Sequence, residues 1–261
     1  MGTDTPLTER RRWIALIVLC FGQLMLVLDT TVVNVALPAI QRDLHVAPAS
    51  LAWVINAYLI TFAGFLLFAG RLGDLIGRKR VFIGGLVLFT LASAACGFSQ
   101  SIAILIAARL LQGVAAAGTG AVIVAIIAAT FTGAQRAKAI GVFMFAFASG
   151  GSIGLLAGGV LTQTLGWHWI FFINLPIAAL IIPLAQVLIE HHEGIGLDNG
   201  IDWPGAVLIT AAVMLGCYAI VEASPHGWTS TVTLGGGASS ARATLAPDTL
   251  WERKIRSSIS G

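Results

Sequence analysis

Residues 70–80 read GRLGDLIGRKR and separate two long apolar runs of the sequence. This segment carries one acid and four bases, although only 10% of the 261 residues are charged. An ionised side chain at the centre of a bilayer costs about 2.5 to 3.5 kcal/mol on insertion scales, so clustered charges are expected in water at a membrane face. We therefore predict that residues 70–80 form a short cytoplasmic connection between two membrane-spanning helices.

The composition indicates an integral membrane protein. Apolar residues make up 57% of the chain and charged residues 10%, whereas soluble domains carry about 25% charged residues. The formal net charge of +3 comes from bases at the ends of apolar runs. Such bases report membrane topology and give no reason to expect a nucleic-acid partner. Cys20, Cys96 and Cys217 are scattered within apolar runs, so we expect neither a disulfide framework nor a metal site.

Seven apolar runs are long enough to cross a bilayer, which takes about 20 residues per helix. They lie at residues 13–37, 51–70, 81–99, 102–128, 139–162, 169–189 and 204–222. The predicted divisions are a cytoplasmic N-terminus (1–12), a six-helix unit (13–189), a cytoplasmic loop (190–203), a seventh helix (204–222) and a polar, disordered tail (223–261).

The basic residues set the predicted orientation. Arg10–Arg12, the bases of residues 70–80 and the pair Arg136 and Lys138 all fall on one side of the predicted spans. The loops on the other side carry few basic residues. Because basic loops stay in the cytoplasm, we predict a multi-pass protein of the plasma (inner) membrane with a cytoplasmic N-terminus.

Two ionisable residues lie deep inside predicted spans. Asp29 is in the first span and Arg109 is in the fourth, and both are at similar depth when residues are counted from the outer ends. An ionisable residue inside the membrane is by default a functional candidate. We predict that Asp29 and Arg109 neutralise each other, or exchange partners as a proton comes and goes. A purely structural ion pair is the alternative.

Polar and aromatic residues near these charges are candidates for a substrate cavity. Thr30 and Asn34 share one face of the first span, and Gln112 follows Arg109 by three residues. Aromatic residues of the second span suit a cationic or planar substrate. Asn and Gln also serve as interhelical hydrogen-bond partners, and Trp53 as an interface anchor. The predicted cavity residues are Thr30, Asn34, Trp53, Asn56, Tyr58 and Gln112.

Small residues form a stripe along the fifth span. Gly150, Gly154 and Gly158 recur at four-residue spacing, and Gly159 lies beside them. Such residues let two helix backbones approach closely. We predict that these four glycines pack against a neighbouring helix in a smooth contact that can rock or open.

A gate is predicted within residues 70–80. Asp74 and Arg78 are four residues apart, which suits an ion pair on one helix face or a cap on neighbouring helix ends. Together with Gly70, Gly77 and Lys79 they form the predicted gating residues, which hold the cytoplasmic side closed.

Several of these segments resemble motifs of one family. Residues 70–80 resemble the loop between the second and third helices of major facilitator superfamily transporters. The stretch LDTTVVNVALP (28–38) is similar to the first-helix motif of the fourteen-span drug:proton antiporters. Residues 105–113 resemble the fourth-helix motif tied to proton coupling, residues 150–159 the antiporter motif of helix five, and residues 166–176 the start of helix six.

This resemblance implies an all-α membrane fold of six helices in two inverted three-helix repeats, followed by a seventh helix. It implies proton-coupled efflux of small lipophilic or cationic compounds, with substrate, protons and the lipid bilayer as partners, no cofactor and no enzymatic activity. Leu155 stands where the antiporter motif has proline, a departure that leaves this helix straighter. The family has a carboxy-terminal bundle that this sequence lacks, so we expect a truncated transporter.

Three alternatives remain at this point. An intramembrane aspartyl protease would need Asp29 and Asp74 face to face, but we expect them at different depths. A retinal protein would need a Schiff-base lysine, which residues 204–222 lack. The third alternative is a non-transporting membrane fragment, or a half that needs a partner chain.

Overall fold

The computed structural model describes residues 9–190, 194–196 and 203–226. Within these residues, seven helical stretches are long and apolar enough to cross a membrane, as predicted. Two short helices, α6 and α7, make up the sixth of these spans. The helices are α1 (Glu9–Leu44), α2 (Pro48–Ile76), α3 (Arg78–Gly97), α4 (Ile102–Thr130), α5 (Gly133–Thr164), α6 (Trp169–Phe172), α7 (Asn174–Leu188) and α8 (Trp203–His226).

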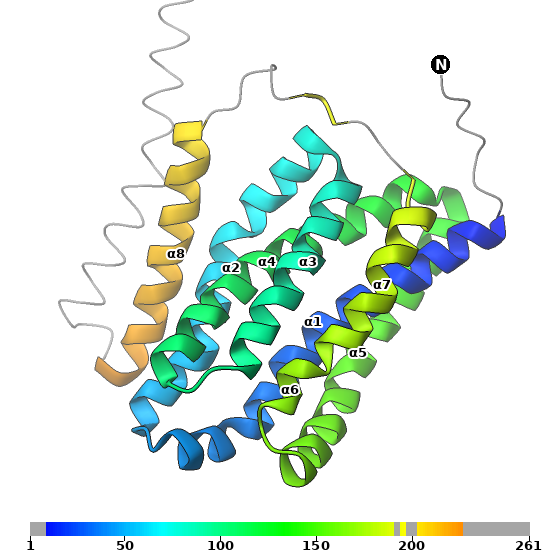
Figure 1. Ribbon diagram of the computed structural model, residues 1–261. Helices are drawn as coiled ribbons and strands as arrows, with labels where there is room; N and C mark the ends of the chain where they lie inside the picture. The colour runs from blue at the N-terminus through cyan, green and yellow to red at the C-terminus, as the bar shows by residue number, and fades with distance from the viewer. Residues whose placement is uncertain (1–8, 191–193, 197–202, 227–261) are drawn as a thin grey trace, which may run out of the picture.

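The packing of the helices has the symmetry of an inverted repeat. Helix α1 packs mainly against α5, and α2 packs mainly against α4, so that each of these contacts is the counterpart of the other when α1–α3 are matched to α4–α7. The contact between α3 and α4 likewise corresponds to that between α7 and α1. Helix α8 stands at one side, against α2 (Figure 1). The predicted six-helix fold with a seventh helix is therefore confirmed.

Several helices extend beyond the predicted spans. Helix α1 continues through Pro38 to Leu44, although the prediction ended this span at residue 37. A proline removes one backbone hydrogen bond, and membrane helices tolerate this loss. Helix α8 reaches His226, so the first four residues of the predicted polar tail are helical. The rest of that tail, and residues 1–8, lie outside the described residues.

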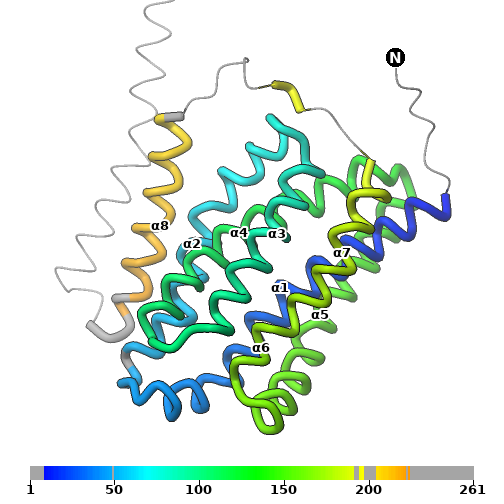
Figure 2. Tube along the Cα trace, viewed as in Figure 1, coloured from blue at the N-terminus to red at the C-terminus, as the bar shows by residue number. Residues whose placement is uncertain are grey.

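The predicted connection at residues 70–80 is wrong in extent. Helix α2 continues to Ile76 and α3 begins at Arg78, so that Gly77 alone separates them; Gly70 lies inside α2. Gly77 has a φ of 102°, a value that residues with a side chain rarely adopt. Charged side chains on the last helical turns can reach water without any loop, which is why the charge pattern overestimated the connection. Figure 2 shows this turn at the same end of the bundle as the start of α1.

Glycines of α5 face α1 at close range. A Cβ atom added to Gly154 would lie 2.8 Å from Thr31 Cβ, and one added to Gly158 would lie 3.0 Å from Val32 Cα. Gly150 meets Val27 in the same way. Gly159 was predicted to share this contact, and that prediction is wrong, because no described atom lies within 4 Å of a Cβ built there. Consecutive helical residues point about 100° apart, and Gly159 is turned away from the close approach to α1 that Gly158 makes.

We expect Gly154→Leu to destabilise the bundle, because its side chain would have to push α1 away from α5. Overpacking of this kind costs about 1 to 3 kcal/mol. The matched control is Gly159→Leu, whose side chain enters open space. Thermal unfolding of both purified variants in detergent is the measurement. Equal melting temperatures would contradict the packing role of Gly154.

Candidate functional site

The structure brings Asp29 and Arg109 into direct contact. Arg109 Nη1 donates to Asp29 Oδ2 over 2.5 Å. Asp29 is 2% exposed and Arg109 is 1% exposed, so neither charge is compensated by bulk water. Removing one partner of such a buried pair leaves an uncompensated charge and is strongly unfavourable.

Neighbouring groups complete the hydrogen bonding of the two charged side chains. Asp29 Oδ1 accepts hydrogen bonds from Gln112 Nε2 at 3.0 Å and from Asn174 Nδ2 at 3.3 Å. Arg109 Nε donates to the carbonyl oxygen of Val54 at 3.1 Å, and its guanidinium carbon lies 4.3 Å from the ring centre of Tyr58. Helices α1, α2, α4 and α7 therefore meet at one charged network.

Three members of this network were not among the predicted site residues: Ser93, Cys96 and Asn174. Asn174 Nδ2 donates to Ser93 Oγ at 2.9 Å, and Ser93 Oγ donates to the carbonyl of Phe171 at 2.9 Å. Cys96 Sγ donates to Gln112 Oε1 at 3.3 Å. An asparagine inside an apolar run was a signal for Asn174, but its distance to Asp29 follows only from helix packing.

A cavity of about 440 Å³ opens between α1, α2, α4 and α5. Its walls are largely apolar and aromatic, and two predicted cavity residues, Thr30 and Tyr58, belong to them. Tyr58 also covers the Arg109 guanidinium, so one residue both lines the cavity and contacts the charged network. The lining residues are Gln23, Leu26, Val27, Thr30, Tyr58, Leu59, Phe62, Leu66, Gly120, Val124, Phe143, Met144 and Phe147.

The other predicted cavity residues lie elsewhere. Gln112 is fully buried in the charged network. Asn34 is exposed on α1, and its amide nitrogen donates to a carbonyl one turn back in its own helix. Trp53 lies with its ring centre 6.0 Å from that of Tyr218 on α8. Asn56 is half-buried on α2. The structure thus gathers only part of the predicted set around one cavity.

Three of the predicted gating residues connect four helices, α2, α3, α4 and α7, at the opposite end of α2 from Pro48. Arg78 Nη2 lies 3.0 Å from Asp74 Oδ1, and Arg78 Nη1 donates to the carbonyl of Ala125 on α4 at 3.3 Å. Lys79 Nζ donates to the carbonyl of Gln186 on α7 at 2.6 Å. The Gln186 carbonyl belongs to the last turn of α7, where the helix dipole favours a positive charge.

Part of the connection between α7 and α8 also reaches this end. The backbone N–H of Ile195 donates to the carbonyl of Asp74 at 3.0 Å, and that of Gly196 donates to the carbonyl of Leu75 at 3.2 Å. Both carbonyls are in the last turn of α2, where a helix leaves acceptors unpaired. The sequence contained no signal for this cap.

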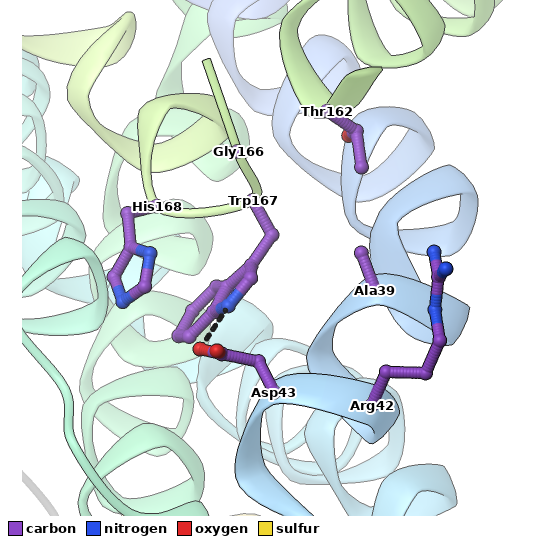
Figure 3. Close-up of a pocket in the computed structure, with 7 residues that line it drawn as sticks. All are labelled: Ala39, Arg42, Asp43, Thr162, Gly166, Trp167 and His168. Atoms are coloured by element: carbon purple, nitrogen blue, oxygen red, sulfur yellow. Dashed lines mark hydrogen bonds between the residues drawn. The ribbon is translucent and has the colours of Figure 1, made fainter. Parts of the chain in front are cut away.

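A second cavity, of about 390 Å³, lies at the other end of the bundle (Figure 3). Trp167 Nε1 donates to Asp43 Oδ2 at 2.9 Å, which joins the end of α1 to the connection between α5 and α6. The His168 ring stacks on that of Trp167 with 3.8 Å between ring centres. Arg42 lines the cavity on the α1 side (Figure 3).

Comparisons with known proteins agree with this architecture. The sequence model of the Major Facilitator Superfamily matches residues 19–199. The chain is 42% identical to the puromycin resistance protein pur8 of Streptomyces alboniger, over 84% of this chain and 44% of that protein. It is 41% identical to the cephamycin export protein CmcT of Amycolatopsis lactamdurans, over 85% of this chain and 47% of that protein.

A solved structure has the same fold. The POT family transporter PepTSo superimposes with a TM-score of 0.66 at 15% identity, over 92% of this chain and 52% of that one. The chain spans less than half the length of the two curated relatives. The match of the family model to most of the chain, together with the packing symmetry and the seven apolar helices, shows that this protein belongs to the major facilitator superfamily.

Proposed function

We propose that this chain provides the amino-terminal bundle of a proton-coupled efflux transporter for small lipophilic or cationic compounds. The observation that carries the proposal is the buried contact of Asp29 and Arg109 beside an aromatic cavity. Relatives at about this similarity include a puromycin resistance protein, a cephamycin export protein and a multidrug resistance protein. Completion of the transport path by a carboxy-terminal bundle is part of the proposal.

Asp29 is the proposed proton carrier, and Arg109 tunes its affinity for the proton. Protonation of Asp29 would cancel the ion pair and leave Arg109 with the Val54 carbonyl, Gln112 Oε1 and the Tyr58 ring. A cationic or planar substrate in the cavity would meet the same Tyr58 ring. Proton binding and substrate binding would therefore both act on Tyr58, and each would change the free energy of the other.

The geometry gives no support to a protease. Aspartyl chemistry needs two adjacent carboxylates, whereas Asp29 is buried against Arg109 and Asp74 is exposed beside Arg78. We accordingly propose no enzymatic activity. A half that needs a partner chain is the second candidate, because the polar side chain of Asn34 is exposed and that of Ser149 is half-buried on largely apolar helices. Polar groups of this kind usually face protein or water rather than lipid.

In a full-length version completed with a carboxy-terminal bundle, we expect Asp29→Asn to abolish pH-driven efflux. The amide side chain of asparagine neither binds nor releases a proton near neutral pH. Arg109→Ala should lose coupling as well. The matched control is Asp43→Asn, which changes an exposed acid of the same helix and keeps an amide oxygen that accepts from Trp167. Efflux is measured in cells as a function of the imposed proton gradient. Wild-type dependence of Asp29→Asn on the gradient would leave Asp29 as a structural residue.

We also propose that Asp74, Arg78 and Lys79, with the glycines Gly70 and Gly77, gate the cytoplasmic end. Asp74→Asn should impair transport without unfolding the protein, because an exposed ion pair one turn apart contributes only about 0.3 to 0.5 kcal/mol to stability. Transport and melting temperature are compared with those of Asp74→Glu, which keeps the charge. Normal efflux by Asp74→Asn would rule out the gating role.

The proposed location is the plasma membrane, with the N-terminus and the α2–α3 turn in the cytoplasm. Basic side chains at that end donate to backbone carbonyls. Arg136 Nε, for example, donates to the Phe131 carbonyl at 2.9 Å. A cluster of bases at this end is consistent with the positive-inside rule. We expect Gln100→Cys to react with an impermeant thiol reagent on intact cells, and Ala134→Cys to react only after permeabilisation. Both positions are exposed, and the unsubstituted chain measures the background. Labelling of Ala134→Cys but not of Gln100→Cys on intact cells would contradict the proposed orientation.

A further inference from the structure

Asn174 has an unusual hydrogen-bonding situation in the charged network. It is fully buried, and its amide nitrogen donates both to Asp29 Oδ1 at 3.3 Å and to Ser93 Oγ at 2.9 Å. Its amide oxygen is buried without a hydrogen-bond partner in the described part of the chain. Because about 90% or more of buried polar groups have a partner, such an oxygen requires an explanation.

The surroundings of Asp29 suit a carboxylate. Arg109 Nη1, Gln112 Nε2 and Asn174 Nδ2 all donate to it. The titratable and charged groups of the network around Asp29 are Arg109 from α4, Tyr58 from α2 and Cys96 from α3. Asn174 from α7 is uncharged. A protonated Asp29 would instead carry an O–H group that must find an acceptor.

Among the three donors, only Asn174 has an acceptor to offer. A guanidinium has none. The amide oxygen of Gln112 already accepts from Arg109 Nη1 at 2.8 Å and from Cys96 Sγ at 3.3 Å. The amide oxygen of Asn174 is unpartnered among the described residues, and a half-turn of the amide exchanges the places of its oxygen and nitrogen.

We propose that Asn174 is a positioning residue that reverses its hydrogen bond when Asp29 binds a proton. With the carboxylate, Nδ2 donates to Asp29; with the carboxylic acid, the amide turns and Oδ1 accepts the new O–H. The proton comes from solvent, and no other bond is made or broken covalently. The Ser93 hydroxyl follows by donating to the same oxygen in place of the Phe171 carbonyl. This inference rests on the proposed function of Asp29 as proton carrier.

The test is infrared difference spectroscopy of the purified chain between high and low pH. The carbonyl band of protonated Asp29 is identified by its loss in Asp29→Asn. In Asn174→Leu, which has a similar size but no acceptor, this band should move to the higher frequency of a carboxylic acid that donates no hydrogen bond. The control is Asn34→Leu, the same replacement at an exposed asparagine that donates to a carbonyl of its own helix, so its band should stay in place.

A second measurement leaves residue 174 intact, in case Asn174→Leu fails to fold. With ¹³C-labelled asparagine, an asparagine amide band should change with the same pH midpoint as the Asp29 band, and the change should vanish in Asp29→Asn. An unshifted acid band in Asn174→Leu, or an amide band indifferent to pH, would overturn the role of Asn174 alone. If no band disappears in Asp29→Asn, the proposed function of Asp29 fails instead.

Discussion

The buried contact between Asp29 and Arg109 is the interaction on which the arrangement of this bundle depends. Two charges removed from water must be satisfied by the protein, and the groups that do so come from α1, α2, α4 and α7. A pair of this kind adds little to stability, because desolvation offsets the attraction. The pair does require the four helices to keep fixed depths and rotations relative to one another, so that these side chains meet. The hydrogen bonds at the network thus specify the packing more than they strengthen it.

Close helix contacts make it possible to enclose such a network. Gly150, Gly154 and Gly158 bring α5 against α1, and a Cβ on Gly85 of α3 would lie 2.5 Å from Thr119 Oγ1 of α4. The two ends of the bundle are held by different means. Bases satisfy helix carbonyls near the α2–α3 turn, and the indole–carboxylate hydrogen bond of Trp167 and Asp43 joins elements at the other end. Smooth contacts between two polar ends suit helices that move as rigid bodies.

Tyr58 links the chemistry of the network to the space beside it. One face of the ring covers the Arg109 guanidinium, and the same residue lines the cavity. Any change in the charge balance of Asp29 and Arg109 is therefore felt at the cavity wall through direct contact. Asn174 donates to Asp29 and to Ser93, and both of these hydrogen bonds are buried. The charged network thus contacts both a residue of the cavity wall and a pair of fully buried polar side chains.

The sequence by itself determined the seven spans, because hydropathy is a local property that each apolar run carries alone. It also identified Asp29 and Arg109 as residues that need each other, since an isolated charge in a bilayer is costly. It could not show that residues 70–80 are helical except at Gly77, because charged helix ends and charged loops meet water equally well. The orientation of Gly159, the contact of Asn174 with Asp29 and the cap of α2 by Ile195 were decided by tertiary structure alone. These features depend on the rotation and distance of helices far apart in the chain, and no local pattern encodes either quantity.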